Sequence, residues 1–157
     1  MSPDNKLSSI TLTRASIIDA ARCWLGTPFR HQGRNSKGID CVGLIIETAR
    51  ALNLIDETFD YTNYSRRPPH GQAFMKHFAD YLVSKNCRQY VPGDIVALKE
   101  PAFPCHCGII GVLNKLPTLI HAYSPRGQVV EEYFDTSKWR ALHVATYEFP
   151  GTQEWHS

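Results

Sequence analysis

Hydrophobic positions in the first half of the chain follow helical spacing. Between residues 15 and 25 apolar side chains recur every three or four positions, Thr13 stands where an N-cap is expected, and Gly26-Thr27-Pro28 ends the run. A second run with the same period begins at or beside Cys41 and continues to Leu52. After a loop, the aromatic and aliphatic residues between 74 and 82 repeat the pattern. The spacing predicts three helices.

Beyond Pro92-Gly93 the pattern changes to short β-prone runs with turn residues between them. Five such runs cover residues 95–99, 107–113, 118–123, 128–134 and 142–149. If the second and third runs pair with residue numbers that sum to 229, Asn114-Lys115 becomes a two-residue hairpin loop. Helices followed by closely spaced strands predict an α+β fold, with N-terminal helices packed on a C-terminal antiparallel sheet of about five strands.

Composition narrows the class of protein. The chain has 157 residues, of which 43% are hydrophobic and 20% charged, so residues 1–157 are expected to form one globular domain. A net charge of +2 and the lack of long basic runs argue against a nucleic-acid partner. Short apolar runs argue against membrane insertion, and the N-terminus does not resemble a secretory signal, so we expect synthesis in the cytoplasm. The five cysteines are expected to be reduced thiols.

Cys41 is the candidate nucleophile. It follows Asp40 at the start of the second helix, where free backbone N–H groups and the positive end of the helix dipole favour a thiolate. The same N–H groups could stabilise an oxyanion on a carbonyl that the sulfur attacks. Asp40 would serve as N-cap, but its charge opposes ionisation of the thiol, so a histidine must outweigh it. The alternative is that Cys41 is a small buried core residue.

His106 and His121 lie in neighbouring strand-like runs. In the register proposed above both rings share one face of the hairpin at diagonal positions, so one ring can orient the other. His31, ten residues before Cys41, is a weaker rival as its partner. The remaining histidines, 70, 77, 143 and 156, fit surface or packing positions. A zinc site in the run from Cys105 to Cys107 is disfavoured because alternation in a strand points His106 away from both cysteines, and we expect no metal.

Several segments of the chain resemble, in order, the NlpC-type cell-wall cysteine peptidases over about residues 14–149. They are residues 25–33 (LGTPFRHQG), 38–44 (GIDCVGL), 92–96 (PGDIV), 106–111 (HCGIIG) and 120–122 (IHA). The resemblance implies a papain-like fold without cofactor, in which Cys41 is the nucleophile, His106 the general base and His121 the group that orients His106. It also implies that Asp40, Phe29 and His31 contact substrate.

The family resemblance implies a substrate as well, the stem peptide of peptidoglycan, cleaved near a γ-D-glutamyl link to a diamino acid. Residues 27–32 and 64–68 look most like the phage-encoded branch, whose partners are phage tail proteins and whose location is the virion. Phe29 stands where relatives commonly have Tyr, and Val42 where many have Ser. Two alternatives stay open, a tail structural component with little activity and an amidase or acyltransferase on the same scaffold.

Overall fold

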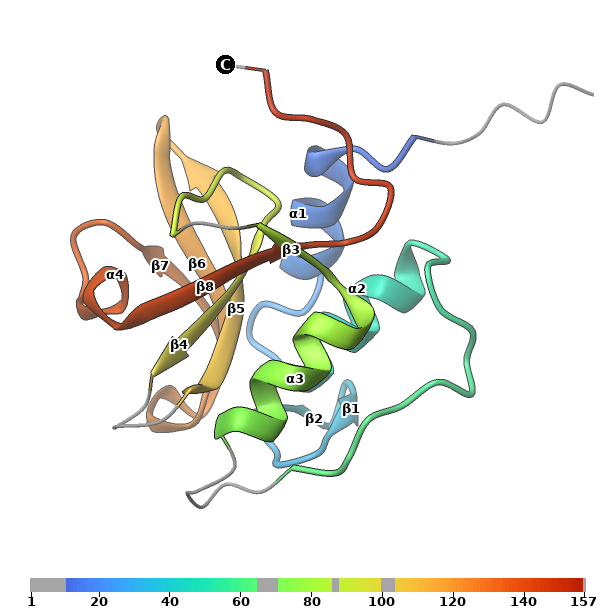
Figure 1. The fold of residues 1–157 in the computed structure, drawn as a ribbon. Coiled ribbons are helices and arrows are strands. Elements are labelled where there is room, and N and C mark those ends of the chain that lie inside the picture. The colour runs from blue at the N-terminus through green and yellow to red at the C-terminus, as the bar shows by residue number, and fades with distance from the viewer. Residues whose placement is uncertain (1–10, 65–70, 86–87, 100–103, 157) are drawn as a thin grey trace, which may run out of the picture.

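The computed structural model describes residues 11–64, 71–85, 88–99 and 104–156. Helices come first and strands later, as the hydrophobic pattern predicts (Figure 1). The elements in chain order are α1 (Arg14–Arg22), β1 (Arg34–Asn35), β2 (Gly38–Ile39), α2 (Cys41–Ala51), α3 (Gly71–Tyr81), β3 (Val83–Lys85), β4 (Ile95–Lys99), β5 (Pro104–Leu113), β6 (Leu116–Tyr123), the 3₁₀ turn η1 (Ser124–Arg126), β7 (Gln128–Tyr133), α4 (Lys138–Leu142) and β8 (His143–Glu148).

The main sheet has six strands in the order β3-β8-β4-β5-β6-β7, and every neighbouring pair is antiparallel. Strands β5 and β6 pair Ile109 with Ile120 and Leu113 with Leu116, so the residue numbers of each pair sum to 229 as predicted. Asn114 and Lys115 close the hairpin with φ of 51° and 65°. Both values are those of a type I′ turn, whose twist matches that of the flanking strands.

Alternation along the strands gives the sheet two buried faces. On one face Ile95, Cys107, Ile109 and Ile120 join the apolar sides of the first two helices in one core. In Figure 1, α1, α2 and α3 lie on this side, while the short helix α4 lies across the sheet from them. On the α4 side a smaller core forms from Val96, Leu98, Ile110, Leu119, Phe134 and Trp139. The helices therefore bury one face of the sheet and α4 covers part of the other.

Apart from shifts of a few residues at the ends of α3 and several strands, the structure differs from the predicted elements at four places. Helix α1 ends at Arg22 instead of residue 25, because the N–H groups of Trp24 and Leu25 bond three residues back and tighten the chain into a turn. Strand β3 adds a sixth strand, and its three mostly exposed residues at the sheet edge carry little alternation signal. Helix α4 precedes β8, and the hairpin β1–β2 forms between the first two predicted helices, where the hydrophobic pattern indicates no element.

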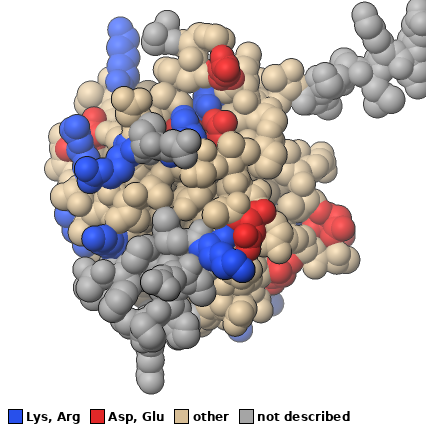
Figure 2. All heavy atoms as spheres, viewed as in Figure 1, with Lys and Arg blue, Asp and Glu red and all other residues tan. Residues whose placement is uncertain are grey.

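Charged side chains of both signs are interspersed on the face shown in Figure 2. The longest helices of the described residues, α2 and α3, have 11 residues each. Within the described ranges, no helix is long and apolar enough to cross a membrane.

Candidate active site

Cys41 is the first residue of α2, and the sequence dictates the start of that helix. Asp40 has extended backbone angles, and its Oδ1 accepts a hydrogen bond from the Gly43 N–H at 2.8 Å, the geometry of an N-cap. Behind it, buried side chains from Val42 to Ala49 hold the helix against the sheet. The Cys41 thiol is thereby fixed, half-buried, beside the first-turn N–H groups.

The β5–β6 hairpin brings His106 and His121 together. His106 Nε2 and His121 Nδ1 lie 2.7 Å apart, and both side chains are buried. Trp139 of α4 packs on the two rings, with centroid distances of 5.1 Å to His106 and 5.0 Å to His121. Since Nε2 of His106 is engaged with His121, Nδ1 is the nitrogen left to exchange a proton with Cys41.

The surroundings of Cys41 lower the pKa of its thiol to about 6. A hydrogen bond from Cys107 is the largest cause, and a hydrogen bond and the charge of His106 add to it. Burial and the negative charge of Asp40 act in the opposite direction and raise the pKa. The expectation that Asp40 opposes ionisation of the thiol is confirmed. The histidine does not outweigh Asp40 alone, because Cys107 also lowers the pKa of Cys41.

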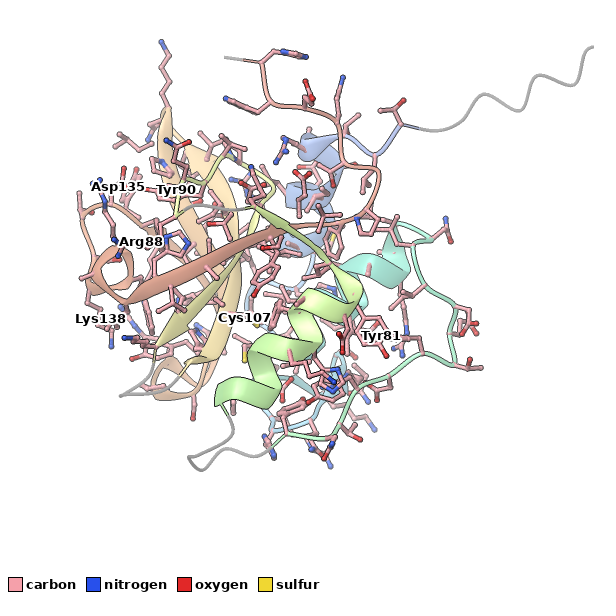
Figure 3. All side chains as sticks on the ribbon, viewed as in Figure 1. Tyr81, Arg88, Tyr90, Cys107, Asp135 and Lys138 are labelled. Atoms are coloured by element: carbon pink, nitrogen blue, oxygen red, sulfur yellow. The ribbon has the colours of Figure 1, made fainter. Side chains whose placement is uncertain are left out.

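Cys107 follows His106 and its side chain points to the other face of β5. Its thiol donates to the backbone oxygen of Cys41 at 3.2 Å. Figure 3 shows Cys107 between the sheet and the helices, whereas Lys138 lies on the α4 side. Adjacent residues of one strand thus approach the same thiol, that of Cys41, one from each face of the sheet.

Burial is the largest cause of the pKa shifts of His106 and His121. It lowers the pKa of His106, although the hydrogen bond and charge of Cys41 raise it in part. It also lowers the pKa of His121, against the influence of Glu132, whose Oε1 is 3.7 Å from His121 Nε2. Before the proton of Cys41 is transferred the ring of His106 is neutral near pH 7, so it can accept that proton and become charged, which is what a general base requires.

Asp40 is buried, and its carboxylate is engaged within the protein. Oδ2 accepts from the Tyr64 hydroxyl at 2.6 Å and from the Gln32 N–H at 2.7 Å, while Oδ1 accepts from Arg34 Nη1 at 3.0 Å. Burial and then Asp40 raise the pKa of Tyr64. These contacts tie the loop before α2 and the segment after it to the helix start. Direct contact of Asp40 with substrate stays a prediction.

Phe29 and His31 lie in the same loop as Gln32. Phe29 forms a parallel bridge with Ile39, the residue before Asp40, and its N–H donates to the Gly127 oxygen at 2.8 Å. His31 is partly exposed, with Nδ1 3.8 Å from Asp40 Oδ2. The backbone of Phe29 and the ring of His31 are therefore near the start of α2, and contact of either side chain with substrate stays a prediction.

The other candidate residues lie apart from this cluster. His143 is buried, with Nε2 2.9 Å from Thr146 Oγ1, His77 packs against Tyr61, and His156 is exposed. Cys23 is exposed. His70, Cys87 and the side chain of Cys105 lie outside the described residues. Among the side chains that are described, no group of three or more His, Cys, Asp or Glu is arranged to hold a metal ion.

Sequence reasoning missed three residues of this cluster. Cys107 could have been found, because alternation that points His106 to one face points Cys107 to the face where α2 packs. Glu132 of β7 faces His121. This pairing could not be predicted, because it depends on the register between β6 and β7. Trp139 lies on α4, in a segment not predicted to be helical.

Comparison with known proteins found no matching family model. The chain is 27% identical over 143 residues to the protein named "Probable endopeptidase NlpC" of Escherichia coli K12, a match that covers 88% of this chain and 79% of that one. An NlpC/P60 family protein from Bacillus cereus superposes with a TM-score of 0.61 at 13% identity over 88% of this chain. This chain spans only 41% of that protein's length.

A second solved structure is of similar size. The NlpC/p60 domain of the peptidoglycan hydrolase SagA superposes with a TM-score of 0.56 at 18% identity, over 87% of this chain and 98% of that domain. The α+β arrangement of helices on an antiparallel sheet is thus confirmed as the papain-like fold of these structures. The chain has the NlpC/P60 fold, and its similarity in sequence to NlpC supports the NlpC/P60 family.

Proposed function

We propose that this chain is a cysteine peptidase that hydrolyses an amide bond in the stem peptides of peptidoglycan. The observation that carries the proposal is the array of a helix-start cysteine with a pKa of about 6, a neutral histidine bonded to it, and a second histidine 2.7 Å behind the first. This is the arrangement that nucleophilic catalysis by a thiol requires. The similarity to NlpC, which is named as a probable endopeptidase, supports the type of reaction, and the fold shared with the peptidoglycan hydrolase SagA supports the substrate class.

The residues suggest the order of steps. Cys41 gives its proton to His106 Nδ1, and the thiolate attacks the carbonyl carbon of the amide. The oxyanion that forms is stabilised by N–H groups at the first turn of α2. His106 then protonates the leaving amine, which breaks the C–N bond and leaves an acyl-enzyme on the sulfur. Water, deprotonated by His106, attacks the acyl carbon and releases Cys41.

The cleaved bond is proposed from the family resemblance as the one near the γ-D-glutamyl link to a diamino acid. Incubation of the protein with purified peptidoglycan, followed by mass spectrometry of the released fragments, tests this. We expect free amino termini on the diamino acid, no product with Cys41→Ala or His106→Ala, and part of the activity with His121→Asn. Fragments cut instead between muramic acid and the peptide would contradict the proposed bond.

An amidase is the second candidate, because a structure named N-acetylmuramoyl-L-alanine amidase from Bacteroides uniformis shares the fold, with a TM-score of 0.54 at 16% identity. The same mass spectra separate the two reactions, and an added amine that appears in the product would reveal acyl transfer. Complete inactivity of a folded protein on all peptidoglycan types would favour a structural component.

We also propose action within a phage tail, from the likeness of residues 27–32 and 64–68 to the tail-associated branch. Residues 65–68 of the second segment lie outside the described part of the chain. Immunodetection of the chain in purified phage particles tests this location, and its absence from particles that are otherwise complete would contradict it.

A further inference from the structure

His121 has a buried ring nitrogen that the site described above does not use. Among the side-chain atoms that the structure describes, Nε2 of His121 is one of the few that are buried without a hydrogen-bond partner. Buried polar atoms of this kind are rare and call for an explanation. The nearest candidate is Glu132 Oε1, at 3.7 Å. The pair lies on neighbouring strands, since β6 and β7 pair His121 with Val130 and Leu119 with Glu132.

The hydrogen-bond chain dictates which nitrogen carries each proton. Nδ1 of His106 can act as a base only if its proton is on Nε2, and that proton then points to His121 Nδ1. His121 Nδ1 is therefore an acceptor, and the His121 proton must be on Nε2, which faces Glu132. In the opposite pair of tautomers, a lone pair of His121 would face a carboxylate. Glu132 disfavours that pair, because two acceptors repel.

Glu132 is held in place for this interaction. Its Oε1 accepts a hydrogen bond from the indole Nε1 of Trp139, the fully buried residue that packs on both histidine rings. His121 is the largest cause that lowers the pKa of Glu132, so the carboxylate is charged near neutral pH. The charge is thus fixed behind His121 at a defined point.

Positive groups also face the histidines. Lys138 of α4 lowers the pKa of both rings, and Arg126 lowers that of His121. Lys138 donates to the Tyr123 hydroxyl at 2.7 Å, and Tyr123 stacks on His121 with a centroid distance of 5.2 Å. With two cations nearby, the formation of a third positive charge on His106 needs a compensating anion. Glu132 is the carboxylate in position to supply it.

We propose that Glu132 is a positioning residue of the catalytic array, which fixes the tautomers of His121 and His106 and stabilises the positive charge that His106 acquires from Cys41. The proposal rests on the proposed function of these residues in hydrolysis. The array then runs from Cys41 through His106 and His121 to Glu132, with Trp139 holding the carboxylate. Glu132 acts through His121 and does not contact the substrate.

The variant Glu132→Gln tests the proposal, because it removes the charge and keeps the shape. The rate at which iodoacetamide alkylates Cys41 is measured against pH. We expect the midpoint of about 6 to move upward by about one pH unit, since the ion pair of Cys41 and His106 loses its support. Hydrolysis of peptidoglycan should fall about tenfold, and Glu132→Asp, which keeps the charge, should restore part of both.

Glu131→Gln is the matched control. Glu131 is the adjacent residue of β7, but its carboxylate is paired with Arg22 at 2.8 Å and accepts from Thr118 at 2.6 Å, on the α1 side of the sheet. Its loss should lower stability and leave the alkylation midpoint where it is. An unchanged midpoint in folded Glu132→Gln, or an equal shift in Glu131→Gln, would overturn the proposal.

A measurement on the unaltered protein covers the case in which Glu132→Gln does not fold. Nitrogen-15 NMR of the histidine rings reports their tautomers, and we expect protons on Nε2 of both His106 and His121. A proton on Nδ1 of His121 would refute the assignment. Alkylation and NMR do not depend on the substrate, so a failure of the peptidoglycan assay alone would count against the proposed function and not against this array.

Discussion

Two neighbours of Cys41 shift the pKa of its thiol in opposite directions. One is adjacent in sequence to Cys41 itself, and the other is adjacent to His106. Cys107, next to His106, is the largest cause that lowers the pKa of Cys41, while Asp40, next to Cys41, raises it by its charge. A hydrogen bond to the charged form lowers a pKa, and a nearby like charge raises it. The position of Cys107 is fully buried, so any small apolar residue would suit it. The thiol is nevertheless a polar neighbour of Cys41.

Replacing Cys107 by valine removes this hydrogen bond and puts an apolar, β-branched side chain in its place, a type that suits a strand. We expect the pKa of Cys41 to rise from about 6 toward that of an ordinary thiol, because the thiolate loses its strongest stabilising contact. The midpoint of alkylation against pH, measured with iodoacetamide and mass spectrometry, should move upward. Cys23→Ala, at an exposed position, is the control and should leave it unchanged. A midpoint that stays near 6 in Cys107→Val would assign the effect to His106 alone.

The sequence was informative for residues whose position in an element determines their chemistry. Cys41 after Asp40 identifies a helix start, and the separation of His106 and His121 identifies a shared hairpin face, so both could be predicted. Arg34 and Tyr64, which bind the Asp40 carboxylate, could not, because they reach it from a two-residue strand and from a loop, and neither segment shows a period. Loop geometry depends on contacts that only the assembled fold provides.

At the scale of elements, the β5–β6 turn places two non-glycine residues at positive φ. Asn tolerates this conformation, but Lys115 at φ 65° lies in a region that costs an ordinary side chain about 1–2 kcal/mol. The type I′ turn favours glycine at this second position. The register of the two histidines therefore depends on a turn with some strain.

Lys115→Gly should relieve this strain and raise the free energy of unfolding by about 1 kcal/mol, after allowance for the greater freedom of glycine in the unfolded chain. Urea denaturation followed by circular dichroism measures the change. Lys115→Ala removes the same exposed side chain and keeps the conformational penalty, so it should give no gain. Equal stabilisation by both variants would show that the lysine side chain, and not its backbone, is unfavourable.

The start of α2 combines a helix cap with a buried charge. Asp40→Ala removes the cap and one of the two carboxylate partners of Arg34, which is 12% exposed and keeps Asp60 at 2.9 Å. We expect the free energy of unfolding to fall by about 3 kcal/mol, since a lost cap costs about 1 kcal/mol and the hydrogen bonds that Arg34 and Tyr64 lose at the buried carboxylate about 1–3 kcal/mol. Thr13→Ala at the start of α1 is the comparison, because Thr13 only caps its helix through the Ser16 N–H. A loss in Asp40→Ala no larger than that in Thr13→Ala would mean that the Arg34 pair contributes nothing.

Elements with a strong period could be predicted, and short ones could not. The bounds of β4 are those predicted, and α2 begins at the predicted residue, because buried positions repeat along both. Strand β3 has three residues and α4 has five, too few for a period to be visible. Both form because a completed sheet offers them an edge or a face, which is information about the whole fold.

On the scale of the whole molecule, the proposed catalytic cluster joins two halves of the chain. Cys41 comes from the helical half, and His106 and His121 from the sheet. Strand β4 connects the cluster to a distant ion-pair network, since Leu98 at one end pairs with His106 and Asp94 precedes the other end. There Asp94 is fully buried and binds Arg14 at 2.8 Å and Lys85 at 2.7 Å. Arg14 also binds Glu148 at 2.9 Å, so this network joins α1, β3, β4 and β8.

The ion-pair network and the Cys41 cluster lie at opposite ends of β4. We therefore expect that the free energy of unfolding and the reactivity of Cys41 can be altered independently. Arg14→Met keeps the apolar stem and removes the charge, which leaves Asp94 with Lys85 alone. We expect the free energy of unfolding to fall by about 3 kcal/mol and Tm by about 10 °C, as for a buried pair that loses one partner. The alkylation midpoint of Cys41 should stay near 6 while the protein is folded, because its causes all lie at the other end of the strand.

Arg140→Met is the control, because it removes an arginine charge at an exposed position. Arg140 is 63% exposed and lies 3.9 Å from Asp135, so its removal should change the free energy of unfolding by less than about 1 kcal/mol. Calorimetry and urea denaturation compare the two variants at one pH. If Arg14→Met moved the Cys41 midpoint in the folded protein, the two ends of β4 would be coupled, and the sheet would transmit changes in the helix–sheet ion pairs to the nucleophile. If it moved only the unfolding transition, the fold would hold the catalytic cluster as a unit whose chemistry depends on its own neighbours.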